Sequence, residues 1–227
     1  MKRLPIPAPG LWTALVLLLA LLIWDASGLD LAIMQLWGHA QGFPLKNNYW
    51  LSHVLHTRGQ QASLWLFLAL WILAWRPLGP WRTLERSQRI AAMMAVTACA
   101  LAIAVLKHFS QTSCPWDLQA FGGPAQYISH WALGMADGGG GKCFPSGHAS
   151  SAFSFLAISL PFLRSPRAHQ QRFGRQLLML VLVVGLVFSL TQTVRGAHYP
   201  SHSLWTAWIC WVLGQLVYRL TCPRPRY

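Results

Sequence analysis

Charged side chains are scarce in this sequence, and acidic ones are nearly missing. Only 10% of the 227 residues are charged, and Asp and Glu together account for five. Soluble domains usually carry about a quarter charged residues, so a water-soluble globular protein is disfavoured. The net charge of +13 arises from the lack of acids, not from a basic run interleaved with aromatic residues. We therefore expect no nucleic-acid partner.

Apolar residues take the place of the missing charges. They make up 54% of the chain, and the mean hydropathy is +0.38. Six apolar stretches predict membrane-spanning helices, although several need polar, uncharged flanks to reach the roughly 20 residues that cross a bilayer. We predict an all-α, polytopic membrane protein with six transmembrane helices in a single membrane-embedded domain, residues 1–227. The stretches cover residues 11–26, 62–75, 90–106, 149–163, 177–190 and 204–220.

The basic residues between these stretches predict the orientation. Six spans place both termini on one side, and the side richer in Lys and Arg should face the cytoplasm. Thirteen basic residues fall on the side of the termini and five on the other, so both termini are predicted to be cytoplasmic in the plasma (inner) membrane. The thirteen are Lys2, Arg3, Arg76, Arg82, Arg86, Arg89, Arg164, Arg167, Arg172, Arg175, Arg219, Arg224 and Arg226, and the five are Lys46, Arg58, Lys107, Lys142 and Arg195.

Three polar patches, residues 107–117, 142–148 and 195–202, fall together on the predicted extracytoplasmic side. In the second patch, Ser146 is a favoured N-cap residue, and Gly147 lets the backbone come close to a ligand. The unpaired N–H groups of the first helical turn would attract an anion, and His148 could give it a proton near neutral pH. The alternative is an ordinary capped helix with an interfacial histidine.

The third patch contains Arg195, His198 and His202. The two histidines are four residues apart, so one helical face can carry both. A cation beside an imidazole suits phosphoryl transfer, since Arg binds phosphate oxygens while a neutral imidazole attacks phosphorus. The histidines could instead bind a transition metal, although no third ligand is near in sequence, or have no role. Lys107 is either a phosphate ligand or a lysine that reaches to the membrane surface.

Together these patches resemble the type-2 phosphatidic acid phosphatase superfamily, which includes membrane lipid phosphatases and vanadium haloperoxidases. The family pattern is Lys-x6-Arg-Pro, then Pro-Ser-Gly-His, then Ser-Arg-x5-His-x3-Asp. The middle motif is complete at residues 145–148, and the resemblance covers about residues 90–220. Three positions depart from the pattern, because Cys114 and Gln192 stand where the family has arginines and His202 stands where it has aspartate.

The resemblance implies a phosphatase that needs no metal or other cofactor. His198 would be the nucleophile that forms a phosphohistidine, His148 would protonate the leaving group, and His202 would orient His198. The phosphate would be held by Lys107, Ser146, Gly147 and Arg195, with Lys142 as a possible substitute for the cation missing at Cys114.

The cysteines add one expectation. Cys114 and Cys143 both fall in the loop of residues 107–147, on the oxidising side of the membrane. We expect a disulfide between them that clamps the first two motifs together, and two free thiols are the alternative.

The predicted function is removal or transfer of phosphate from a lipid, with phosphatidic acid, phosphatidylglycerol phosphate, a polyprenyl diphosphate and phosphorylated lipid A as candidates. The predicted partners are this lipid phosphate substrate and the surrounding membrane lipids, and the oligomeric state is left open. A transporter or flippase is disfavoured, because ionisable residues within the spans are scarce. A non-catalytic protein on a degenerate phosphatase fold remains an alternative, as does a haloperoxidase that binds vanadate.

Overall fold

The computed structural model describes residues 9–132 and 134–222, and this part of the chain is all-α, as predicted. The longer helices are α1 (Pro9–Ala26), α3 (Gly59–Trp75), α4 (Arg86–Phe109), α7 (Ala168–Val194) and α8 (Pro200–Thr221). A further apolar segment runs without a break through α5 (Gly147–Phe153), the 3-10 segment η5 (Ser154–Ser159) and α6 (Leu160–Leu163). The shorter elements are α2 (Leu29–Gln35), the π-helix η1 (Trp50–Arg58) and the 3-10 turns η2 (Gly79–Thr83), η3 (Pro115–Asp117) and η4 (Gln119–Phe121).

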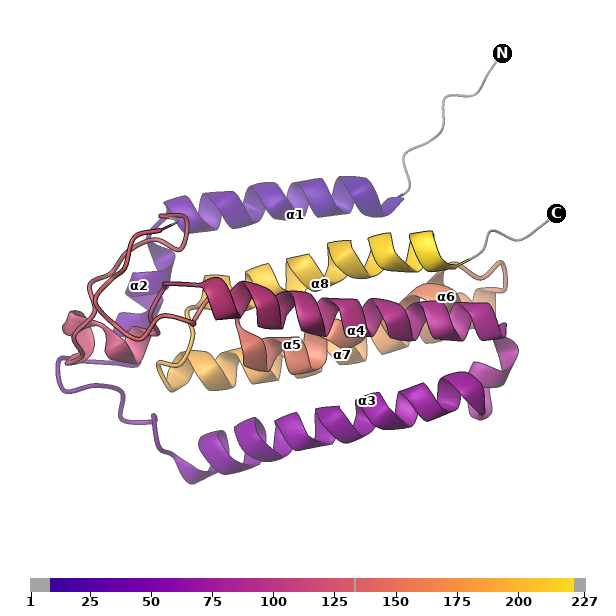
Figure 1. Ribbon diagram of the computed structural model, residues 1–227, viewed down its shortest axis with the longest axis horizontal. Coiled ribbons are helices and arrows are strands. Elements are labelled where there is room, and N and C mark those ends of the chain that lie inside the picture. Colours follow the sequence, from indigo (N-terminus) through magenta and orange to yellow (C-terminus); the bar gives the residue numbers. More distant parts are fainter. Residues whose placement is uncertain (1–8, 133, 223–227) are drawn as a thin grey trace, which may run out of the picture.

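The long helices lie side by side along the longest axis of the molecule (Figure 1). α8 packs against α4 and α5, α5 packs against α7, and α1 and α3 contact α8 and α4 from the outside. Small residues permit close approach: a Cβ added to Gly185 of α7 would lie 2.1 Å from Cε1 of Phe153 in α5. Such glycine contacts are typical of helix packing in lipid, where no hydrophobic effect drives helices together and dispersion contacts must do so.

Three helical segments are long and apolar enough to cross a membrane: Trp50–Thr83, Arg86–Phe109 and Ala168–Val194. The pair Trp12–Ala26 and Leu29–Gln35, bent by 63°, would be a fourth if it forms one span. By length and composition, the described residues therefore contain three to four candidate spans where the sequence predicts six. The segment Gly147–Leu163 is apolar but shorter, and α8 opens with a polar turn.

The two ends of the bundle differ in their residues. The α3–α4 turn, the α6–α7 turn and the end of α8 lie at one end, and α2 and the loop after α4 lie at the other (Figure 1). The arginines of the larger basic set that the structure describes belong to the first end or to helix turns next to it. Residues 1–8, 133 and 223–227 lie outside the described part of the chain, and with them Lys2, Arg3, Arg224, Arg226 and the two predicted cytoplasmic termini.

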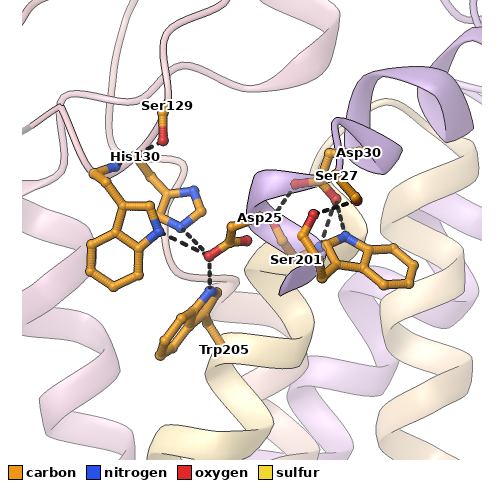
Figure 2. Close-up of polar contacts among 9 residues, drawn as sticks. Asp25, Ser27, Asp30, Ser129, His130, Ser201 and Trp205 are labelled. Carbon is orange, nitrogen blue, oxygen red and sulfur yellow. Dashed lines mark hydrogen bonds and ion pairs between the residues drawn. The ribbon is translucent and has the colours of Figure 1, made fainter. Parts of the chain in front are cut away.

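Two aspartates fasten the elements at the loop end (Figure 2). Asp30 of α2 accepts hydrogen bonds from the backbone N–H of Ser201, at 3.0 Å, and from its hydroxyl, and so caps α8 from a neighbouring helix. Asp25, at the end of α1, accepts the indole N–H groups of Trp131 and Trp205 at 2.9 and 2.8 Å. These bonds join α1, α2 and the long loop to the start of α8.

Candidate active site

The first two motifs meet where α4 ends and α5 begins. Lys107 lies in the last turn of α4, and a Cβ added to Gly147 would come within 3.3 Å of its Cδ and 3.5 Å of its Nζ. The lysine side chain therefore crosses directly over the first residue of α5. Ser146 is fully buried and caps this helix, with its Oγ accepting the N–H of Ala149 at 3.4 Å.

His148 is held between two rings. Its imidazole stacks on Phe188 of α7, with ring centroids 4.5 Å apart, and faces His56 of η1 on another side at 4.6 Å. Both ring nitrogens are buried and meet no hydrogen-bond partner of good geometry in the described part of the chain. A buried polar group without a partner is costly, so a ligand that supplies one is expected here.

Arg195 follows the last residue of α7 and is bound on two sides. Its Nε donates to the carbonyl oxygen of Lys46 at 3.0 Å, and its Nη1 donates to Oε1 of Gln192 at 3.3 Å. Gln192 is 2% exposed, and its Nε2 is buried without a hydrogen-bond partner among the described residues. The glutamine that replaces the family arginine thus carries a free N–H donor next to a guanidinium.

His198 and His202 do not share a helical face, which corrects the expectation from their spacing. α8 begins at Pro200, so His198 lies in the preceding turn and only His202 is helical. Nδ1 of His202 lies 3.0 Å from the carbonyl oxygen of Cys143, and Nδ1 of His198 lies 3.4 Å from the sulfur of the same residue. The two imidazole centroids are 5.9 Å apart, and no hydrogen bond joins them in the described structure.

The disulfide between Cys114 and Cys143 is present, with the two Cα atoms 5.2 Å apart. It ties the segment after α4 to the segment before α5 and places Cys143 against both His198 and His202. The two sulfurs and His198 also form a group of ligand-type atoms compact enough for a metal ion. Sulfurs bonded to each other are not thiolates, so this group lacks the donors that a zinc site needs.

Lys142 does not reach the other predicted phosphate ligands. Its side chain is exposed, and its backbone has a φ of 57°, with the N–H donating to the carbonyl of Ser110 at 2.7 Å. No contact joins its side chain to the predicted site within the described residues. The residue shapes the loop before α5, and its proposed substitution for the cation missing at Cys114 has no geometric support.

The electrostatics of the site are positive. Burial lowers the pKa of the His198 imidazole well below its ordinary value, and the nearby charge of Lys107 acts in the same direction. His198 is therefore neutral at neutral pH, with a lone pair available for attack. Each of the three histidines is influenced by the positive charge of Lys107, of Arg195 or of both, and no carboxylate is among the groups that dominate their surroundings. The three are His56, His148 and His198.

The family model described as the PAP2 superfamily matches residues 89–225, more than half of the chain. The chain belongs to the PAP2 superfamily. Members of the PAP2 superfamily are generally phosphoesterases, which supports a phosphatase or phosphotransferase role. No curated protein and no solved structure matches the chain.

The structure adds residues to the predicted set. His56 was not predicted, because it belongs to no motif and lies about 90 residues before His148 in a long, mixed segment. Its one signal in the sequence is the pair His53 and His56, on the side of the membrane where the three polar patches are predicted to lie. The unpartnered N–H donor of Gln192 was also not predicted. The sequence shows only that glutamine replaces the family arginine, although both side chains carry N–H donors.

Proposed function

We propose that this PAP2 superfamily member is an integral membrane enzyme that removes or transfers phosphate from a lipid phosphate or diphosphate at the extracytoplasmic face, through a phosphohistidine on His198. The observation that carries the proposal is the neutral, buried imidazole of His198 among Lys107, His148 and Arg195. Such a site can bind an anion and supplies a nucleophile and a proton donor.

The chemistry runs in two steps. A neutral ring nitrogen of His198 attacks phosphorus, the phosphorus–oxygen bond to the leaving group breaks, and the departing oxygen takes both electrons of that bond and a proton from His148. His148 enters this step as an imidazolium, because the bound phosphate dianion stabilises the protonated ring. Water then attacks the phosphohistidine, gives a proton to His148 and releases His198 neutral and phosphate free. An acceptor hydroxyl in place of water would make the same site a phosphotransferase. Lys107, Arg195 and the N–H groups around Ser146 and Gly147 would stabilise the phosphoryl oxygens.

In this proposal the backbone carbonyl of Cys143, which also interacts with the His198 imidazole, takes part of the role of the missing aspartate. A carbonyl accepts a hydrogen bond as a carboxylate does, but it carries no full charge to stabilise an imidazolium. His202 then acts through Cys143, which it contacts, and not through a bond to His198. A carbonyl therefore stabilises a charged His198 less than the family's aspartate would. This difference is the observation that keeps a non-catalytic PAP2 superfamily protein as the second candidate.

Several features support the membrane setting. The site lies at one end of the bundle, next to apolar helices that expose residues such as Trp65 and Leu180, and this position suits a substrate with a long tail. We propose that the segments α5–α6 and α8, with α1, complete the three long apolar segments to six spans. The domain then covers the whole chain, and the basic turns at the opposite end of the bundle are cytoplasmic.

The test is release of phosphate from a panel of purified lipid phosphates and diphosphates in detergent micelles. His198→Ala should reduce release to the background rate, and His169→Ala, an exposed histidine at the start of α7, should leave it unchanged. Enzyme quenched during turnover of radiolabelled lipid should carry acid-labile phosphate that His198→Ala lacks. Full turnover in His198→Ala would refute the nucleophile, and no release by the wild-type chain from any lipid would favour the non-catalytic candidate.

A further inference from the structure

The π-helix η1 brings an additional histidine to the site. η1 runs directly into α3 and packs against α7. The approach depends on Gly59, the first residue of α3, where an added Cβ would lie 2.9 Å from Cζ of Phe188. Phe188 also stacks on His148. The close contact at Gly59 therefore sets η1 beside His148, the proposed proton donor. π-Helical turns are frequent at functional sites.

Two histidines of η1 have different surroundings. The ring of His56 is half-buried and lies 4.6 Å from that of His148, with the planes inclined at 34°. His53 is exposed, and its ring lies 5.2 Å from that of Tyr49, outside the site. The segment therefore offers one histidine that faces the site and, three residues earlier, one that does not.

The charged groups that act on His56 are cations. His56 lies within the electrostatic range of Arg195 and Lys107, and His198 in turn is influenced by His56. The acids that could balance these groups are engaged elsewhere: Asp25 and Asp30 bind the start of α8 and its neighbours, and Asp137 binds Ser113.

On the basis of the proposed function, we propose that His56 and His148 form a second phosphate subsite and that the substrate is a lipid diphosphate. The terminal phosphate lies against His198, Lys107 and Arg195. The phosphate attached to the lipid lies at the edges of the His148 and His56 rings, whose centroids are 4.6 Å apart and leave no room for it between the rings. With this ligand, the buried ring nitrogens of His148 meet an anion that supplies a hydrogen-bond acceptor.

The reaction then has a specific leaving group. A ring nitrogen of His198 forms a bond to the terminal phosphorus, and the bond from that phosphorus to the bridging oxygen breaks. The bridging oxygen keeps the electron pair and accepts the proton of His148, so the product that departs is a lipid monophosphate. His56 donates an N–H hydrogen bond to a non-bridging oxygen of this product, which a lipid alcohol leaving from a monophosphate does not have.

The test compares farnesyl diphosphate with farnesyl monophosphate, which share one chain and differ by one phosphate. His56→Ala should lower kcat/KM for the diphosphate about tenfold or more, the usual effect of losing a hydrogen bond to a charged group. Turnover of the monophosphate should change less than about twofold, because the lost bond has no partner there. His56→Gln keeps an N–H donor and should recover part of the loss, and His53→Ala should match the wild type with both substrates.

Each outcome decides one claim. Equal losses on both substrates in His56→Ala, the same loss in His53→Ala, or a wild-type enzyme that cleaves only the monophosphate would overturn the second subsite. If His56→Ala fails to fold, the ratio of the two rates in His56→Gln gives the same decision. His198→Ala separates the two hypotheses. Turnover that survives in His198→Ala contradicts the proposed function. If His198→Ala is inactive but the His56 variants keep the wild-type ratio of diphosphate to monophosphate rates, only the subsite is contradicted.

Discussion

At the scale of single residues, His198 combines a buried imidazole with positive neighbours. Burial removes the water that would stabilise an imidazolium, and Lys107 repels it. Both effects hold the pKa below 6.5 in the folded enzyme, so the ring keeps its lone pair at a pH where an exposed histidine is already protonated. The proposed nucleophile is therefore kept unprotonated by its surroundings, without a carboxylate to accept its proton.

This environment predicts the acid side of the pH–rate profile. Protonation of His198 removes the nucleophile, and because its pKa is lowered, kcat/KM should stay high as the pH falls through 6.5 and decline only below it. Lys107→Met should move this acid limb to higher pH by removing a positive charge, even though it also weakens phosphate binding. Lys142→Met should leave the limb in place. A limb above 6.5 in the wild-type enzyme, measured as kcat/KM between about pH 4.5 and 8, would contradict the assignment.

At the scale of elements, the disulfide organises the loop between α4 and α5. The backbone N–H of Cys143 donates to the carbonyl of Thr112 at 2.9 Å, so the two ends of the loop run side by side next to the Cys114–Cys143 bond. The same Cys143 supplies the carbonyl that His202 contacts and the sulfur against His198. One residue thus links loop closure to the position of His198.

Opening this disulfide should reduce both stability and activity. For two cysteines separated by 29 residues, the entropy of the closed loop corresponds to about 3–4 kcal/mol. We expect the double variant Cys114→Ser, Cys143→Ser to unfold at a lower temperature in detergent and to lose most of its turnover. Reductant should produce the same change in the wild type and none in the double variant. If reductant opens the bond, as verified by mass mapping, and the unfolding temperature stays the same, this account is wrong.

At the scale of the whole molecule, the two ends of the bundle define its orientation. The site, α2 and the long loop lie at one end, and the basic turns lie at the other (Figure 1). Two arginines near those turns make cation–π contacts within the protein. The Arg86 guanidinium lies over the Trp75 ring, and the Arg164 guanidinium lies over the Tyr218 ring. The positive-inside rule then predicts that the basic end faces the cytoplasm.

Cysteine labelling tests this orientation. In a chain with Cys222→Ser, a cysteine at Gln126 in the long loop should react with a membrane-impermeant maleimide in intact cells. A cysteine at Thr83, in the α3–α4 turn, should react only after the membrane is permeabilised. Both positions are exposed in the structure, so access is decided by the membrane. The reverse pattern would place the site in the cytoplasm and refute the predicted topology.

The sequence alone was enough to predict the all-α fold, the PAP2 superfamily and the residues of its motifs, because apolar runs and contiguous motifs are local properties of the chain. The six predicted spans exceed the three to four candidate spans of the described residues, because Gly147–Leu163 is short and α1 meets the length requirement only together with α2. Only the tertiary structure placed His56 beside His148, bonded Gln192 to Arg195 and set Cys143 against two histidines. It also showed that α8 starts after His198 and that Lys142 points away. These features depend on contacts between residues far apart in the sequence, which no local spacing determines.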